Sequence, residues 1–143
     1  MRTVGGKAIR MKFDDLAEAQ KRMKEISKET PEVVDGVTKG IATDLLAAVQ
    51  ENLTGKAGMP RRVTGEYQAS WSIVKLDGSI FRRRYALASS APQVRRLEYG
   101  FVGEDAMGRL VQQAPLPHLR PAAETVMQGV RDKYKDALRE MFQ

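Results

Sequence analysis

The chain of 143 residues is 42% hydrophobic and 29% charged, a composition typical of a folded domain and not of a disordered segment. It has no cysteine and a single histidine, His118, which excludes disulfides, thiolate metal ligands and a cysteine nucleophile. One histidine is also too few for the usual zinc site, and charged residues interrupt every apolar run. We therefore expect no metal, no cofactor, no catalytic site and no membrane span.

The first third of the chain predicts an arm followed by two helices. Residues 1–12 lack the apolar run of a secretory signal and predict a flexible arm. Apolar residues recur at helical spacing through 13–29. The pair Thr30-Pro31 then predicts a break, because proline suits the first turn of a helix and disfavours its interior. A second helix is expected over about 31–53.

The middle of the chain predicts an exposed loop and then an antiparallel hairpin over about 66–88. The loop is residues 54–64, which contain two glycines, a proline and three basic side chains. Apolar and polar residues alternate from Tyr67 to Ile73, as in a half-buried strand. Asp77-Gly78 is a turn signal, and a second strand is expected over Ile80–Ala88.

The alternation also predicts the register of this hairpin. A three-residue loop, 77–79, places the large apolar residues of both strands on the face of Trp71, whereas a two-residue turn mixes them with arginines. We prefer the three-residue loop. It leaves Arg82 and Arg84 on the opposite, polar face. The residues that it gathers on the apolar face are Trp71, Ile73, Phe81, Arg83, Tyr85 and Leu87.

The remainder predicts a short helix over 92–99 closed by Gly100, a loop or second short hairpin over about 101–116, and a C-terminal helix over about 120–142. The fold class is therefore α+β, with helices packed on a small antiparallel sheet in a single domain over 13–143. The core is expected to contain Leu45, Val49, Trp71, Ile73, Tyr85, Val126 and Val130.

Positive charge is concentrated in one segment of the chain. The net charge is +6, and residues 56–96 hold nine basic side chains against two acidic ones. A local excess of this kind attracts a polyanion or an acidic protein surface, although a solvated basic face is the alternative. Lys56, Arg61 and Arg62 in the loop are candidates for partner contact.

Three patches resemble the head–tail joining, or tail-completion, family of long-tailed bacteriophages. Thr64–Trp71 is similar to the family's Thr-Gly-x-Leu-x-x-Ser segment. Tyr85-Ala86 and then Val94–Gly100 resemble its Tyr-Ala…Leu-Glu-Phe-Gly pattern, and Ala114–Ala122 resembles its Pro-Phe-Leu-x-Pro-Ala segment, with His118 where phenylalanine is usual. The residues that carry the resemblance are Thr64, Gly65, Trp71, Tyr85, Leu97, Glu98, Tyr99, Gly100, Pro117, Leu119, Pro121 and Ala122.

The resemblance implies a structural virion protein, a neck subunit that is made in the host cytoplasm and forms a sixfold homo-oligomeric ring at the head–tail junction. Its partners would be further copies of itself, neighbouring connector or tail proteins, and the genomic DNA passing through the channel. Arg82 and Arg84 would then face that channel.

Two other functions compete with this interpretation. The basic segment 56–96 also suits a nucleic-acid-binding accessory protein, although no helix-turn-helix, zinc module or RNP-type motif is visible. An enzyme is not supported by any residue spacing. Glu98 lies near the negative end of a predicted helix, so we expect it to have a compensating partner, either Arg95 or a neighbouring subunit.

Overall fold

The computed structural model describes residues 13–61, 64–76, 78–79 and 82–143 and confirms the α+β class. The expected arm over 1–12 lies outside the described residues. The elements in chain order are α1 (Phe13–Asn52), α2 (Glu66–Ala69), β1 (Trp71–Leu76), β2 (Arg84–Ser89), α3 (Val94–Tyr99), β3 (Phe101–Glu104), β4 (Leu110–Gln113), α4 (Leu119–Met127) and α5 (Val130–Met141).

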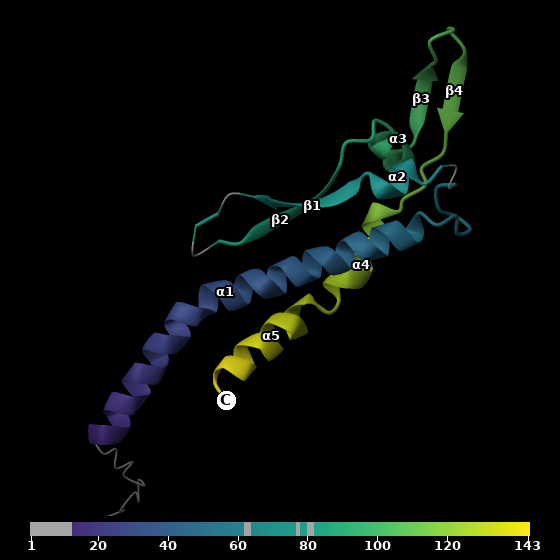
Figure 1. The fold of residues 1–143 in the computed structure, drawn as a ribbon. Coiled ribbons are helices and arrows are strands. Elements are labelled where there is room, and N and C mark those ends of the chain that lie inside the picture. Colours follow the sequence, from purple (N-terminus) through teal and green to yellow (C-terminus); the bar gives the residue numbers. More distant parts are fainter. Residues whose placement is uncertain (1–12, 62–63, 77, 80–81) are drawn as a thin grey trace, which may run out of the picture.

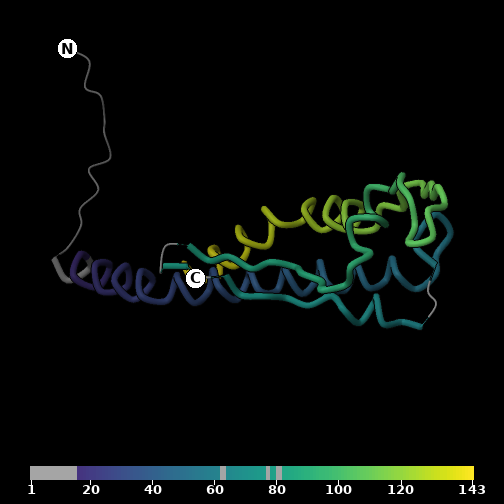
Figure 2. Tube along the Cα trace, turned by 90° about the horizontal axis from the view of Figure 1, so that it is seen from above, coloured from purple at the N-terminus to yellow at the C-terminus, as the bar shows by residue number. Residues whose placement is uncertain are grey.

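The long helix α1 is the axis of an elongated molecule (Figure 1). The antiparallel β1–β2 ribbon lies along one side of α1, and the helices α4 and α5 lie along another (Figure 2). The second antiparallel pair, β3–β4, projects beyond the end of this body (Figure 1). In the described part of the chain, no helix is both long and apolar enough to cross a membrane.

The predicted helix break at Thr30-Pro31 is wrong, because α1 continues through Pro31. The hydroxyl of Thr30 donates to the carbonyl of Ile26 at 2.6 Å, and Ile26 is buried. Arg22 donates to the carbonyl of Met141 at 2.9 Å, so the end of α5 is tied to α1 on the N-terminal side of the proline. The tertiary contact of Arg22 holds the segment before Pro31 against α5, and α1 continues as one helix that bends visibly in its first half (Figure 1).

The predicted start of the first strand is also wrong, because residues 66–69 form the single helical turn α2. Gly65 precedes α2 with φ of 84°, a left-handed conformation that favours glycine. Gln50 and Gln68 exchange side-chain-to-carbonyl hydrogen bonds of 3.4 and 2.7 Å, which fasten α2 to α1. This contact with α1 favours the helical turn over the strand that alternation predicts.

The ribbon confirms the predicted faces of the residues that it pairs and corrects the predicted loop, because Arg82 and Arg83, expected in the second strand, lie before β2. Leu76 pairs with Arg84 and Ile73 with Leu87, so the connection between paired ends is residues 77–83 and not the expected three residues. The observed pairing of the two strands differs from the predicted pairing by an even number of residues, so the same side chains still share a face. Trp71 lies on the face opposite Arg84, as the alternation predicts. Phe81 lies outside the described residues.

The expected single C-terminal helix is two helices, α4 and α5, separated at Gln128-Gly129. Glycine is a poor helix former, and a change of direction at this point lets both helices contact α1. The short helix α3, closed by Gly100, and the second hairpin β3–β4 agree with the predictions for 92–100 and 101–116.

The core is smaller than predicted. Its buried cluster consists of Val49, Leu53, Trp71 and Ala122, and the expected Leu45 packs against it partly buried. The remaining expected members are only half-buried and lie outside this cluster, because the ribbon and α5 each cover α1 from one side without closing over one another. These members are Ile73, Tyr85, Val126 and Val130.

Candidate functional site: a buried polar junction

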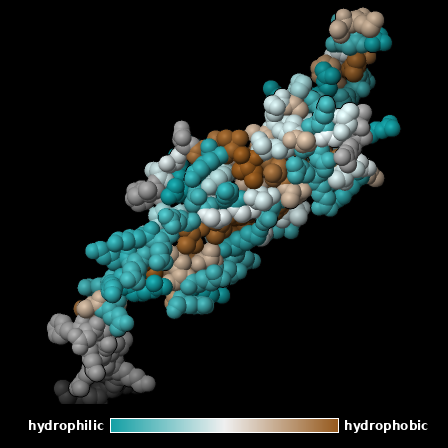
Figure 3. All heavy atoms as spheres, in the orientation of Figure 1, coloured by the Kyte–Doolittle hydropathy of each residue, from teal (hydrophilic) through white to brown (hydrophobic). Residues whose placement is uncertain are grey.

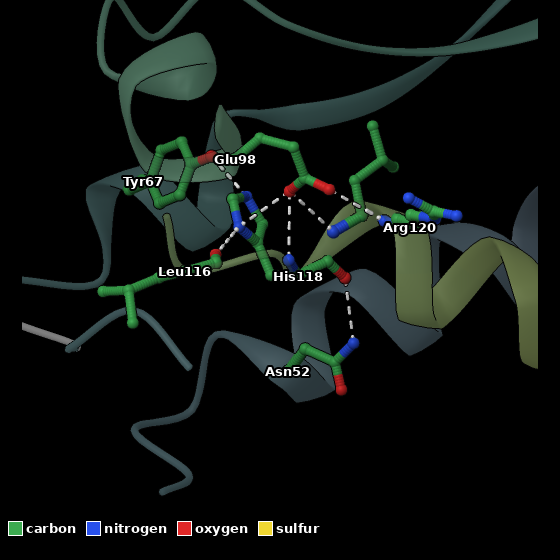
Figure 4. Close-up of polar contacts among 7 residues, drawn as sticks. Asn52, Tyr67, Glu98, Leu116, His118 and Arg120 are labelled. Carbon is green, nitrogen blue, oxygen red and sulfur yellow. Dashed lines mark hydrogen bonds and ion pairs between the residues drawn. The ribbon is translucent and has the colours of Figure 1, made fainter. Parts of the chain in front are cut away.

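The three sequence patches that carry the family resemblance meet at one place in the fold. Tyr67 comes from α2, Glu98 from α3, and His118 from the residue preceding α4 (Figure 4). Glu98 is 8% exposed and His118 is fully buried. We call Tyr67, Glu98 and His118 the polar junction.

Glu98 caps the N-terminus of α4. Its carboxylate accepts hydrogen bonds from the backbone N–H groups of His118 at 3.0 Å, Leu119 at 3.1 Å and Arg120 at 3.0 Å. These are donors that the first turn of a helix leaves unpaired, and the positive end of the helix dipole favours an anion there. The expected partner of Glu98 was Arg95 or a neighbouring subunit. The partner is instead the start of α4, which the sequence pattern does not reveal.

The cap holds Glu98 in its charged form. Burial by itself raises the pKa of Glu98, but the hydrogen bonds from the three backbone N–H groups and the interaction with His118 outweigh burial. The pKa of Glu98 therefore lies below its ordinary value. Because Glu98 already occupies these donors, the N-terminus of α4 is not an open anion site.

The geometry shows which His118 nitrogen donates to Leu116 and Glu98. Nδ1 lies 2.9 Å from the carbonyl oxygen of Leu116 and 3.2 Å from the Glu98 carboxylate, two acceptors, so Nδ1 carries a proton. Nε2 shares a hydrogen bond of 2.6 Å with the Tyr67 hydroxyl. Burial, and next the charge of Glu98, raise the pKa of Tyr67 to about 12, which keeps this hydroxyl protonated.

Further contacts lock the junction onto α1 and the core. Asn52, the last residue of α1, donates to the carbonyl of His118 at 2.9 Å. The Tyr67, Trp71 and His118 rings meet edge to face with centroids 5.5–6.1 Å apart. The histidine is thus part of the packed interior.

Gly100 sets the direction in which the β3–β4 hairpin leaves the junction. Its φ is 80°, and a Cβ built on it would lie 2.8 Å from the carbonyl oxygen of Gln113 and 3.0 Å from the nitrogen of Pro115. Only glycine satisfies both constraints. Glu98 precedes β3 and His118 follows β4, so the junction clamps both ends of the hairpin. The polar groups of the junction bond to one another and to the backbone, so the role that the geometry supports for them is to hold these elements in position.

The other motif residues support the same region. The Thr64 hydroxyl accepts from the N–H of Glu66 at 3.3 Å, and the carbonyl of Leu97 accepts from Leu116 at 2.7 Å. Pro121 lies in the first turn of α4, as predicted. Ala122 is buried and Leu119 packs on the core, whereas Pro117 and Tyr99 are exposed.

The predicted contact residues lie outside the junction. Arg84 is exposed as the first residue of β2, and Arg82 is exposed in the connection that precedes it. Lys56 is exposed and pairs with Glu51 at 2.7 Å, and Arg61 is exposed nearby. Arg62 lies outside the described residues. The structure thus leaves the described candidates accessible to partners but does not gather them at one site.

A second polar contact, which the sequence did not predict, fastens the β1–β2 ribbon to α1. The Tyr85 hydroxyl donates to Asp35 at 2.9 Å, and Lys75 and Arg83 approach the same carboxylate at 3.5 and 4.0 Å. The Tyr85 hydrogen bond, and then the two cations, lower the pKa of Asp35 against the opposing effect of burial. Tyr85, a motif residue, therefore has a structural role here.

Among the residues that the structure describes, no group of three or more His, Asp or Glu side chains is arranged to hold a metal ion. Comparisons of the chain with models of protein families, with curated proteins and with solved structures give no match.

Proposed function

We propose that this protein is a structural ring subunit of the head–tail junction of a tailed bacteriophage. The observation that carries the proposal is the large exposed surface of the isolated chain. A folded monomer of this mass is expected to expose about 7,400 Å², whereas this chain exposes 11505 Å². The residues outside the described part, counted as unfolded chain, account for at most about 2,800 Å². When these residues are left out of both the exposed area and the area expected for a compact monomer, the exposed area is still roughly 2,000 Å² larger than expected.

An excess of this size matches what a ring subunit buries. A standard interface covers about 800 Å² on each partner, and every subunit of a closed ring has two neighbours. The two contacts of a subunit use different surfaces in such a ring. An elongated chain with separate projections suits this geometry better than a symmetric dimer with one shared face.

Exposed apolar side chains occur on separate projections. Figure 3 shows hydrophobic surface in the middle of the molecule and on the projecting β3–β4 hairpin. Val102 is 71% exposed and Leu110 70% exposed on one face of that hairpin, with Met107 at its tip. Met23 is 59% exposed near the far end of α1. Apolar surface this accessible favours burial against other chains.

The arrangement of the motif residues also supports the phage assignment. The patches that resemble the tail-completion family are separated in sequence, yet each contributes one residue to the polar junction. Motifs that meet in space are easier to explain as parts of one inherited architecture than as chance matches. We propose a sixfold ring in the virion neck, assembled from the host cytoplasm, with connector and tail proteins as neighbours.

The assembly state provides the first test. Mass photometry of the purified protein over a range of concentrations should give closed oligomers, and electron microscopy of particles should place the ring at the neck. A protein that stays monomeric at every concentration and is absent from the neck would contradict the proposal.

The channel-facing role of Arg82 and Arg84 has its own test. Both side chains are exposed, so changing both to glutamate should alter the free energy of unfolding by less than about 1 kcal/mol. Rings should still form, but DNA retention or ejection should be impaired, as measured by the packaged DNA content of particles. Failure to form rings would instead place these arginines at a subunit interface.

The basic segment favours a second candidate, a nucleic-acid-binding accessory protein. Arg82, Arg84, Arg95 and Arg96 are all exposed in the structure. Binding of free DNA by the monomer, with an affinity that falls steeply as salt increases, would support this function. A ring that merely surrounds the genome predicts weak binding, since DNA has to slide through it.

A further inference from the structure

An open groove lies between α1 and α5. It has a volume of about 410 Å³. Half-buried Val37, Ile41 and Ala137 form its floor, and the acids Asp136 and Glu140 lie on its rim. Neither acid forms an ion pair with any residue in the described part of the chain. Because they are four residues apart on α5, their like charges also repel one another.

A glycine in α1 keeps this groove accessible. Gly40 lines the groove, and a Cβ built on it meets no atom of the chain within 4 Å. Gly36, one turn earlier, has the same open surroundings. Glycine inside a helix is unfavourable relative to alanine, and nothing in the described fold requires its small size here. Closer approach by a second chain would use that space.

A surface of complementary charge lies on α3 and β3, away from the groove (Figure 1). Arg95 and Arg96 on α3 have no acidic partner among the described residues, and the Arg96 guanidinium lies 4.2 Å from the centre of the Phe101 ring. Tyr99 is 77% exposed beside them. Arginine and tyrosine are among the residue types that dominate binding energy at protein interfaces. We call Arg95, Arg96, Tyr99 and Phe101 the α3–β3 patch.

We propose that the α1–α5 groove of one subunit binds the α3–β3 patch of a second copy of this chain. The inference rests on the proposed ring and identifies its subunit contact. The groove has three acids and one lysine, Lys133, which pairs with the groove's own Asp44, so its net charge is −2. The patch has two arginines and no acid, and its exposed Tyr99 supplies an aromatic ring for the groove floor. The two surfaces are different and lie apart along the body (Figure 1), as a head-to-tail contact requires.

Charge reversal tests the contact in the full-length protein. One variant carries Arg95→Glu and Arg96→Glu, and a second carries Asp136→Lys and Glu140→Lys. Each places like charges across the contact, so the concentration for half-assembly should rise at least about tenfold. An equimolar mixture of the two variants should assemble again, because each reversed surface then faces its complement. A single chain with all four changes should assemble by itself.

Matched variants control for net charge. Arg131→Glu with Lys135→Glu changes the charge as the patch variant does, and Glu29→Lys with Glu32→Lys changes it as the groove variant does. All four side chains are exposed and lie outside both surfaces. These controls should assemble as the wild type does. Circular dichroism should show unchanged helix content in every variant.

The possible outcomes separate the contact from the ring itself. If both reversed variants form rings as the wild type does, the proposed contact is overturned but the proposed ring subunit is not. Reversed variants that fail to assemble even when mixed would also overturn it. Loss of DNA binding in the patch variant, with rings intact, would assign the patch to nucleic acid. A wild type that never assembles would overturn both the contact and the proposed function.

Discussion

Glu98→Gln is the most informative single change at the polar junction, because it removes the charge and nearly preserves the shape. The carboxylate accepts three backbone N–H groups at 3.0–3.1 Å. Loss of an anion at a helix N-terminus costs up to about 2 kcal/mol in a buried setting. A donor left facing the new amide NH₂ costs about 1–3 kcal/mol more. We expect the free energy of unfolding at pH 7, measured by urea denaturation, to fall by about 2–4 kcal/mol.

Two comparisons make this prediction specific. Glu124→Gln removes a carboxylate that is 65% exposed and paired with Arg120 on the same helix, so it should change the free energy of unfolding by less than about 1 kcal/mol. The effect of Glu98 should also depend on pH. Its pKa in the folded protein is below the ordinary 4.5. The stabilisation is therefore present above pH 4.5 and disappears as the pH falls through the folded value. A Glu98→Gln protein as stable as the wild type at pH 7, or a difference that stays constant in acid, would refute the capping role.

Two further changes test the core and the base of the hairpin. Trp71→Ala should lower the free energy of unfolding by about 3–5 kcal/mol because the ring is 4% exposed in the buried cluster. Trp71→Phe should cost much less, since the indole N–H has no hydrogen-bond partner among the described residues; a thermal melt unchanged by the alanine would contradict this core. Gly100→Ala should be strongly destabilising, because its Cβ meets the carbonyl of Gln113 at 2.8 Å. Gly108→Ala is the matched control, as it shares a positive φ of 74° in open space and should cost only about 1 kcal/mol; equal losses in the two variants would show that backbone conformation alone matters.

Periodicity predicted the elements that are held mainly by their own sequence. The hydrophobic stripe of α1, the short α3 with its closing Gly100, and the faces of the ribbon all followed from local pattern. The errors occur where tertiary contacts override that pattern. Pro31 is accommodated because Ile26 and Arg22 hold the preceding turns in place. The turn before Trp71 is helical because Gln68 bonds to α1.

The polar junction was only partly predictable. The position of Glu98 at the end of a short helix indicated that its charge needs a partner, which is correct. The sequence could not identify that partner, since the donors are backbone N–H groups about twenty residues further along the chain. His118 and Tyr67 carry no local signal for their contact, and only the packing of α2 against the start of α4 brings them together.

The small core raises the question of how so extended a chain keeps a defined shape. Polar contacts join each peripheral element to its neighbour: Asp35 holds the ribbon, Thr38 bonds to Tyr134 of α5 at 2.6 Å, and Glu98 holds α4 beside the hairpin. Hydrogen bonds have preferred distances and angles, so such contacts can fix the orientation of an element without burying much apolar surface. They leave the long surfaces of the molecule open while fixing their relative orientation. In the ring that we propose, a neighbour would therefore bind without the entropy cost of ordering those surfaces.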